Sequence, residues 1–373
     1  MTSARPVVAV LFGGRSSEHS ISCLSAASVL AAIDSAAYEV IAVAISRDGR
    51  MFAHSGNPAD LSKVADRLPE VLTSDPAIGQ QVLLSTDPTI RGFVSVDGSA
   101  LPAAFTSVDV VFPVLHGPYG EDGTIQGALE FASLPCVGSG VFASAAAMDK
   151  AHMKSMFVAH NLPVGPFEVV SMAQWKRDAE QCLGRVDAMG YPVFVKPSRA
   201  GSSIGITKVK SRADLTAAIE AAQAHDPKVI VEASIDGMRE IECGVLVDAD
   251  GIARASLPAE IIVTGAHEFY DFDAKYLEDS AQLVVPAELD AVTTSRVQAA
   301  AIAAFESLDC EGFARCDFFV LANGDVIINE VNTLPGFTSI SMFPRMWQAT
   351  GLSYPEIVAT LIQDALRRGC GLR

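Results

Sequence analysis

The sequence contains no paired-cysteine motif, no long apolar run and no excess of basic residues. Its seven cysteines form no C-x-x-C pair, and their odd number in a chain of 373 residues favours reduced thiols over a disulfide framework. No segment approaches the roughly 18 apolar residues of a membrane-spanning helix, and residues 1–6 contain no apolar signal segment. We therefore expect a cytoplasmic protein without a membrane partner.

The charge balance also argues against a nucleic-acid ligand. The chain has 44 acidic and only 27 basic residues, which gives a formal net charge of -17. Such a surface repels nucleic acid and anionic lipid, so we expect no nucleic-acid partner. An anionic small molecule would need local lysines, arginines, backbone amides or metal ions to bind it.

The chain does contain enough apolar sequence for more than one hydrophobic core. With 373 residues, 50% of them hydrophobic, it is expected to form about two or three domains around a cleft. Apolar runs at residues 7–12, 38–45 and 108–115 predict strands, and a helical pattern at residues 21–33 predicts that they form a parallel sheet. Residues 51–107 show no persistent period, and we interpret them as an elaboration of this first domain.

The remaining sequence predicts helices and hairpins. Residues 144–160 have a helical pattern, and Ser171 with Gln174 predicts a capping box at a helix start. Strands at 193–196 and 204–209 flank a Gly/Ser-rich hairpin tip. The other predicted elements are helices at 123–132, 211–225 and 288–308 and strands at 228–233, 240–247, 252–263, 313–321 and 326–331, with Pro258 interrupting the third of these strands.

The strongest chemical signal is a group of polar residues in the last predicted hairpin. Alternate residues of a strand share a face, so Arg315 lies beside Asp317 and Glu330 beside Asn332. Facing one another, Asp317, Glu330 and Asn332 offer oxygen ligands of the kind Mg²⁺ prefers. Ordinary ion pairs on a solvated hairpin are the alternative, but the apolar neighbours indicate burial, where unpaired carboxylates need a cation.

A second signal is the loop from Lys196 to Gly205, which places Ser202 and Ser203 after Gly201. Small side chains let backbone amides approach phosphate oxygens, and the lysine adds a mobile positive charge. The loop lacks the Walker A order of residues, and taken alone it is more often only a turn.

These segments together resemble the ATP-grasp superfamily, and more narrowly the D-alanine:D-alanine ligase family. The resemblance covers nearly the whole chain in order, apart from residues 51–107. It implies a three-domain ATP-grasp fold, α/β with an N-terminal parallel-sheet domain and α+β in the ATP-grasp part, with domains at 1–122, 123–234 and 235–373. The segments that carry it are Met148 to Lys150, Lys196 to Gly205, Arg315 to Asp317, Asn329 to Asn332, and residues 13–22, 116–127, 269–276 and 332–338.

The resemblance also implies how ATP and metal are held. Lys150 and Lys196 would contact the α- and β-phosphates, Glu232 the adenine amino group and Glu240 the ribose. The loop serines Ser202 and Ser203 would lie over the phosphates, and Lys275 would reach the γ-phosphate. The ligands of Mg²⁺ or Mn²⁺, two ions in this family, would be Asp317, Glu330 and Asn332.

For the amino-acid substrates, the resemblance implies a second set of residues. Glu18 would pair with the ammonium of the first D-alanine, with His116 nearby, and Arg315 would face the acyl oxygen. A closing loop would link Tyr276, Ser202 and Glu18 and exclude water. The second carboxylate would be received by the turn that contains Gly336, Ser341 and Met342.

The function that the resemblance implies is ATP-dependent joining of two D-alanines through a D-alanyl phosphate. Such a ligase supplies peptidoglycan precursors for the cell wall and cell shape, and the family suggests a homodimer. One rival is an NAD(P)-dependent oxidoreductase, but the turn at Gly13 lacks the G-x-G-x-x-G spacing. The other is a non-catalytic nucleotide-binding module, which would not need acyl-transfer groups such as Arg315 and Lys275.

Overall fold

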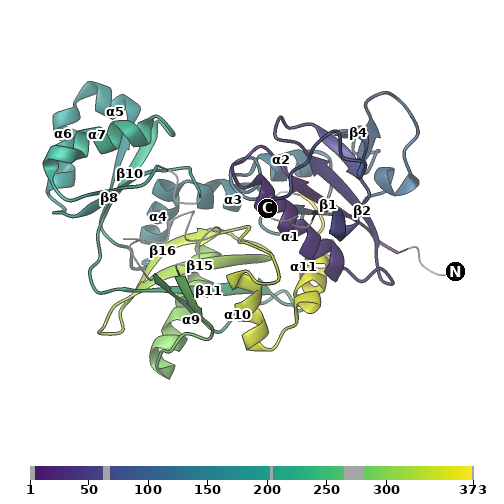
Figure 1. Cartoon of the computed structure of the whole chain (residues 1–373). Coiled ribbons are helices and arrows are strands. Elements are labelled where there is room, and N and C mark those ends of the chain that lie inside the picture. Colours follow the sequence, from purple (N-terminus) through teal and green to yellow (C-terminus); the bar gives the residue numbers. More distant parts are fainter. Residues whose placement is uncertain (1–4, 62–67, 202–204, 264–280, 372–373) are drawn as a thin grey trace.

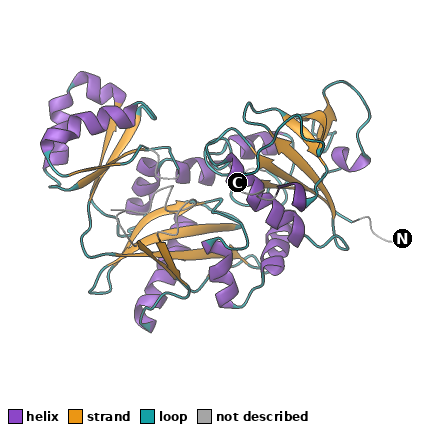
Figure 2. Cartoon of the chain, viewed as in Figure 1, coloured by secondary structure: helices purple, strands orange, loops and turns teal. Residues whose placement is uncertain are grey.

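The computed structural model describes residues 5–61, 68–201, 205–263 and 281–371. Within these ranges the strands form three sheets (Figure 1). Their strands come from residues 7–114, 167–233 and 239–332 respectively, so each sheet is built from one stretch of the chain. Helices and strands mix throughout (Figure 2), as the predicted α/β class requires. None of the helices in the described ranges is long and apolar enough to cross a membrane.

The first sheet contains the predicted parallel strands. Strand β1 (Val7–Gly13) lies between β2 (Glu39–Ile45) and β6 (Val110–Val114) and is parallel to both. Helix α1 (His19–Ala32) makes the crossover from β1 to β2. Every residue of β1 is buried, which is typical of a central parallel strand covered on both faces. The strand predictions and their parallel pairing are therefore confirmed.

Residues 51–107 extend this sheet, and their strands were missed by the sequence pattern. Strands β3 (Met51–His54), β4 (Ile78–Leu84) and β5 (Phe93–Ser95) add antiparallel partners in the order β5-β4-β3-β2-β1-β6. Two short 3₁₀ turns, Pro58–Leu61 and Ala103–Thr106, lie between them. The prediction that this stretch elaborates the first domain agrees with that pairing.

The helical pattern predicted at residues 144–160 is confirmed, but a break at Asp149 divides it into two helices. After α2 (Thr124–Phe131) the chain forms two helices, α3 (Val141–Met148) and α4 (Lys150–Ala159). Asp149 separates them with an extended backbone, and its carboxylate accepts a hydrogen bond from the His152 backbone N–H at 3.3 Å. The N-cap preference of aspartate explains the break, which makes Lys150 the first residue of α4.

The second sheet is a small antiparallel one with the order β7-β10-β8-β9. The predicted hairpin is formed by β8 (Val193–Pro197) and β9 (Thr207–Val209), and the predicted capping box of Ser171 and Gln174 is present. Helices α5 (Met172–Arg177), α6 (Ala179–Asp187) and α7 (Arg212–Gln223) gather on one side of the sheet (Figure 1). The other two strands are β7 (Phe167–Ser171) and β10 (Lys228–Ala233).

The third sheet has the order β14-β13-β11-β15-β16 and is antiparallel. The predicted interruption near Pro258 is confirmed, because separate strands β12 and β13 both pair with β11. Helix α9 (Ala291–Ser307) contacts the sheet and shares its apolar core. The strands are β11 (Arg239–Val247), β12 (Ala253–Ala255), β13 (Ala259–Val263), β14 (Ala281–Val284), β15 (Phe313–Val320) and β16 (Val326–Asn332).

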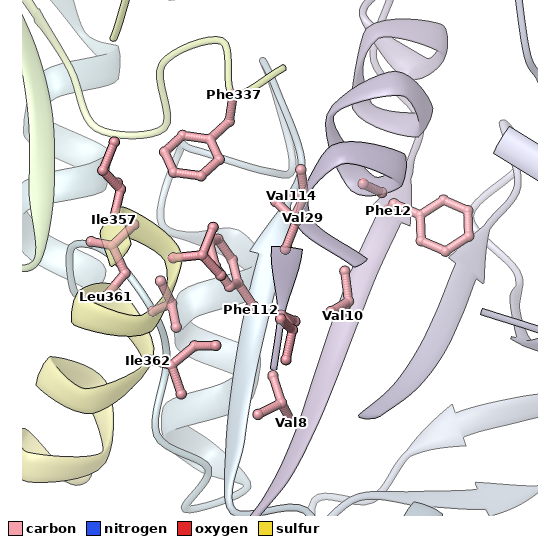
Figure 3. Close-up of a cluster of buried hydrophobic side chains, with 14 of the residues drawn as sticks. Val8, Val10, Phe12, Val29, Phe112, Val114, Phe337, Ile357, Leu361 and Ile362 are labelled. Carbon is pink, nitrogen blue, oxygen red and sulfur yellow. The ribbon is translucent and has the colours of Figure 1, made fainter. Parts of the chain in front are cut away.

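The C-terminal helices connect the third sheet to the first. Helix α10 (Met342–Thr350) contacts β11, whereas α11 (Tyr354–Arg368) contacts α1 and β6. Figure 3 shows Ile357, Leu361 and Ile362 of α11 facing the side chains of the first sheet, among them Phe112. The loop after β16 is anchored in the same core through Phe337. The division into three domains stays a prediction.

Candidate active site

The polar residues of the last hairpin lie on directly opposed positions. Asp317 of β15 is paired with Glu330 of β16, and Arg315 is paired with Asn332. The ladder shifts between Asp317 and Phe318, and a bulge of this kind re-aims neighbouring side chains. The Asn332 amide N–H donates to Asp317 Oδ2 at 3.0 Å. The structure therefore brings all four predicted residues together.

Arg315 is held as a fixed cation at the centre of this group. Its Nε and Nη2 atoms donate to the two carboxylate oxygens of Asp317, both at 2.7 Å, and Nε lies 3.2 Å from Glu242 Oε1. Burial alone would lower the pKa of Arg315, but Asp317 and Glu242 hold it well above its ordinary value. Glu242 was missed by the sequence reasoning. The sequence feature that could have identified Glu242 is its spacing of two residues from Glu240 along β11, which places both side chains on the same face.

The predicted metal ligands offer two carboxylates and one amide. Side-chain exposure is 15% for Asp317 and 24% for Glu330, so both lie close to the surface of the hairpin. In the part of the chain that the structure describes, no three His, Cys, Asp or Glu side chains form a group that could hold a metal ion. A set with few carboxylates fits Mg²⁺, which completes its coordination with water and phosphate oxygens.

Lys150 connects this hairpin to the predicted phosphate loop. From the first position of α4, its Nζ lies 3.3 Å from Glu330 Oε2 and donates to the Ala200 carbonyl at 3.0 Å. The residue predicted to contact phosphate thus lies beside a carboxylate predicted to bind metal. The neighbouring Gly201 is the last residue described before the loop serines.

Glu232 lies between two lysines where β8 and β10 pair. The Lys196 ammonium contacts Oε2, and the Lys154 ammonium lies 3.1 Å from Oε1. Burial alone would raise the pKa of Glu232, but the two lysines lower it to about 2. Lys154 is another residue that sequence reasoning missed. The sequence feature that could have identified Lys154 is its position on an apolar helix, one turn after Lys150.

Glu240 lies on β11 within electrostatic reach of the same lysine. Burial alone would lower the pKa of Lys196, but Glu232, Glu330 and Glu240 together raise it. These three carboxylates come from the second and third sheets. The residues predicted to hold ATP therefore converge where the two sheets face one another.

Glu18 occupies a tight space that two glycines leave open. It precedes α1, and its side chain is buried. A Cβ atom at Gly117 would lie 2.8 Å from Glu18 Oε2, and one at Gly201 would lie 3.4 Å from it. Gly117 also has φ +75°, which disfavours other residues. The loop after β8 thus comes close to Glu18.

His116 is buried with both ring nitrogens engaged. Its Nδ1 lies 3.0 Å from the Leu334 carbonyl oxygen, and its Nε2 lies 3.0 Å from the Ser25 hydroxyl. A carbonyl can only accept, so Nδ1 carries the proton and Nε2 accepts from Ser25. Burial lowers the pKa of His116, which keeps the ring neutral. His116 therefore anchors the loop after β16.

Glu121 in the same loop is a further residue that sequence reasoning missed. The Gly117 backbone N–H donates to Glu121 Oε1 at 2.8 Å, and Leu334 makes a backbone hydrogen bond with the same carboxyl group. Burial of the carboxyl group and the nearby Glu18 charge raise the pKa of Glu121 to about 8. His116 and Glu121 thus both hold the backbone at Leu334, directly before the predicted second-substrate turn.

That turn is compact. The Thr338 backbone N–H donates to Ser341 Oγ at 3.1 Å, and a Cβ at Gly336 would lie 3.3 Å from the same oxygen. Ser341 precedes α10, of which Met342 is the first residue. The positive end of that helix therefore faces the turn.

The other predicted residues are Ser202, Ser203, Lys275 and Tyr276, which lie outside the described residues.

Comparison with known proteins gives a consistent result over the whole chain. The family model of the D-ala D-ala ligase N-terminus matches residues 7–139, and that of the D-ala D-ala ligase C-terminus matches residues 156–363. A D-alanine–D-alanine ligase of Streptomyces coelicolor is 51% identical over 99% of this chain and 95% of its own length. One from Mycobacterium avium is 51% identical over 100% of this chain and 99% of its own.

Solved structures are similar over the same extent. A D-Ala:D-Ser ligase from Enterococcus faecalis has a TM-score of 0.85 and 35% identity, covering 97% of this chain and 100% of that one. A D-alanine–D-alanine ligase from Coxiella burnetii has a TM-score of 0.82 and 34% identity, covering 98% and 95%.

Proposed function

This chain belongs to the D-alanine–D-alanine ligase family, and from that premise we propose how its residues join two D-alanines at the expense of ATP. The chain has the ATP-grasp fold of these ligases. Its product is D-alanyl-D-alanine, which serves peptidoglycan precursor synthesis. The rival oxidoreductase and non-catalytic readings are thereby excluded. The assignments that follow concern individual residues, metal ions and assembly.

ATP binds between the second and third sheets, with its base against Glu232 and its ribose against Glu240. Lys150 and Lys196 contact the α- and β-phosphates, and the loop with Ser202 and Ser203 covers them. The convergence of these carboxylates and lysines supports the assignment. Lys196 then exchanges its contact with Glu232 for phosphate oxygens, which offer a stronger charge-assisted partner.

Asp317, Glu330 and Asn332 would hold Mg²⁺ or Mn²⁺, with two ions expected from the family. When bound, the metal supplies positive charge to the γ-phosphate during transfer. Arg315 contacts Asp317 and Lys150 lies beside Glu330, so each of these carboxylates has a neighbouring cation. Asn332 would bind the metal through its amide oxygen, since its amide N–H donates to Asp317.

The first D-alanine binds through its ammonium to Glu18, beside His116. One oxygen of its carboxylate attacks the γ-phosphorus, which releases ADP and gives D-alanyl phosphate. Lys275 contacts the γ-phosphate, and Tyr276 closes the loop over Ser202 and Glu18 to exclude water. The neighbouring Gly201, placed beside the Glu18 carboxylate, supports a loop that closes at this point.

The second D-alanine binds by its carboxylate to the turn of Gly336, Ser341 and Met342. Its free amine attacks the acyl carbon, and the tetrahedral oxyanion is stabilised by Arg315 before phosphate leaves. His116 positions this turn rather than removing the amine proton, because both of its ring nitrogens are engaged.

The protein works in the cytoplasm as a homodimer.

The observation that carries the residue assignments is the convergence of Lys150, Glu330, Asp317 and Arg315 on the final hairpin. Phosphate release should require ATP, Mg²⁺ and D-alanine together, and should stop in excess chelator. L-alanine should not replace D-alanine, and D-serine should be a poorer acceptor. Phosphate release that is independent of any D-amino acid would contradict the assignment.

A further inference from the structure

We propose that Lys154 is a positioning residue that keeps Glu232 ionised, so that the site selects adenine over purines with an oxygen at C6. The inference deepens the proposed function, because it rests on Glu232 binding the adenine amino group. Lys154 itself would touch neither the nucleotide nor the amino acids. It would act through Glu232 alone.

The two lysines that contact Glu232 differ in their burial and in how firmly they are held. Lys154 Nζ lies 3.1 Å from Oε1, with only 4% of the Lys154 side chain exposed. The helix α4 that carries it packs Met153 and Phe157 into the core of the third sheet, which fixes the lysine stem. Lys196, which contacts the other oxygen, has 14% of its side chain exposed.

Lys196 has alternative partners, whereas Lys154 is committed to Glu232. The carboxylates of Glu330 and Glu240 also act on Lys196, and its ammonium lies 5.9 Å from the centre of the Phe194 ring. When phosphate draws Lys196 away, Oε2 becomes open to a ligand. Lys154 is then the cation that remains on Glu232 and prevents the buried carboxylate from taking up a proton.

The charge on Glu232 decides which base can bind. An ionised carboxylate only accepts hydrogen bonds, so it pairs with the C6 amino group of adenine and repels the C6 oxygen of hypoxanthine. A protonated carboxyl group can donate to that oxygen and would accept both bases. Selection of this kind relies on leaving the wrong ligand with an unpaired polar group.

The surroundings of Glu232 agree with an ionised state. Burial alone would raise the pKa of Glu232, but Lys154 from α4 and Lys196 from β8 lower it to about 2. The residue opposite Glu232 on β7 is Phe167, which carries no charge. The two lysines are the charged groups that act most strongly on Glu232.

The test compares ATP with ITP as substrates of the full-length enzyme, with Mg²⁺ and saturating D-alanine. In Lys154→Met, the ratio of kcat/KM for ATP over ITP should fall on the order of tenfold, the size of one charge-assisted hydrogen bond. Most of the change should appear as a lower KM for ITP rather than a change in kcat for either nucleotide. Lys154→Arg should restore most of the ratio. Lys176→Met removes an exposed lysine of the neighbouring α5 and should leave the ratio unchanged.

Two further variants keep the outcome decisive. Lys154→Gln, which is neutral but polar, replaces Lys154→Met if thermal unfolding shows that the latter does not fold. Glu232→Gln offers both a donor and an acceptor, so it should also lose the preference for ATP. If Glu232→Gln keeps the wild-type ratio, the adenine assignment itself fails and the inference fails with it. If Glu232→Gln loses the ratio but the Lys154 variants keep it, the role of Lys154 alone is overturned.

Discussion

Two regions of this molecule neutralise buried carboxyl groups in opposite ways. Between the second and third sheets, Glu232 is flanked by Lys154 and Lys196, and the pKa of its carboxyl group falls to about 2. In the loop after β6, Glu121 lies near Glu18, and its pKa rises to about 8. In the first region, two lysine ammonium groups offset the charge of the Glu232 carboxylate. In the second region, a bound proton removes the charge of Glu121. The difference teaches that burial alone does not set the charge state, because the neighbouring charges decide it.

This comparison has a functional meaning under the proposed mechanism. The cation-rich region must receive the negative phosphates of ATP, and its lysines can exchange a carboxylate for a phosphate. The region that contains Glu18 and Glu121 must receive an ammonium group, so an excess of carboxyl groups suits it. A protonated Glu121 adds no second negative charge beside Glu18, the proposed partner of the ammonium group.

The largest effect is expected from removing Arg315, the central cation of the β15–β16 hairpin in the third sheet. Arg315→Met would leave Asp317 and Glu242 without their shared cation, which should cost about 3–5 kcal/mol of unfolding free energy. Turnover should fall by about 10³-fold, since the oxyanion donor is lost as well. Urea unfolding and steady-state kinetics measure both losses. Arg315→Lys restores the charge but not the two-pronged contact, and it should give intermediate values.

The next effect concerns one carboxylate of the same hairpin. Glu330→Gln keeps the side-chain volume but removes a charge from the proposed metal ligands and from the partner of Lys150. Turnover should fall by at least about 10²-fold while the folded structure and part of the ATP binding persist. Activity near the wild-type value at saturating Mg²⁺ would show that Glu330 is not a metal ligand.

A smaller effect is expected in stability, because the contributions of Glu121 and Glu232 to it depend on pH in opposite directions. The folded pKa of Glu121 lies above its unfolded value, so its contribution to stability is present at low pH and is lost as pH rises toward about 8. The folded pKa of Glu232 lies below its unfolded value, so its contribution is present above about pH 4.5 and is lost as pH falls toward about 2. Glu121→Gln should therefore flatten the stability loss between about pH 5 and 8, on the order of 1–3 kcal/mol. Denaturant unfolding at several pH values checks this, and an unchanged slope would mean that Glu121 is ionised throughout.

The sequence predicted those parts of the fold in which local patterns and burial agree. Strand β1 is apolar at nearly every position, and β15 alternates between buried and half-buried residues before a hairpin turn, so β1 and the last hairpin were recognised. Strand β4 was missed because its residues are mostly half-exposed, a glycine and two glutamines interrupt its apolar residues, and its pairing depends on distant partners. The break between α3 and α4 was missed because it depends on one side-chain cap at Asp149 within a helical pattern.

The residues of the candidate site also differ in whether a local sequence pattern could identify them. Arg315, Asp317, Glu330 and Asn332 were predicted because alternation along two strands already places them together. The roles of Lys154, Glu242 and Glu121 depend on elements that meet only in the folded chain. Lys154 reaches Glu232 across 78 residues of sequence, a pairing that no local pattern encodes. Tertiary placement, rather than residue type, gives these three their significance.

The central claim is that ligation passes through D-alanyl phosphate, and oxygen transfer tests it most directly. D-Alanine labelled with oxygen-18 in its carboxylate is converted with unlabelled ATP and Mg²⁺, and the released phosphate is analysed by mass spectrometry. Attack of a carboxylate oxygen on the γ-phosphorus leaves that oxygen on the phosphate when the second amine displaces it. The account predicts one labelled oxygen in each released phosphate. Dipeptide formed together with unlabelled phosphate would contradict it.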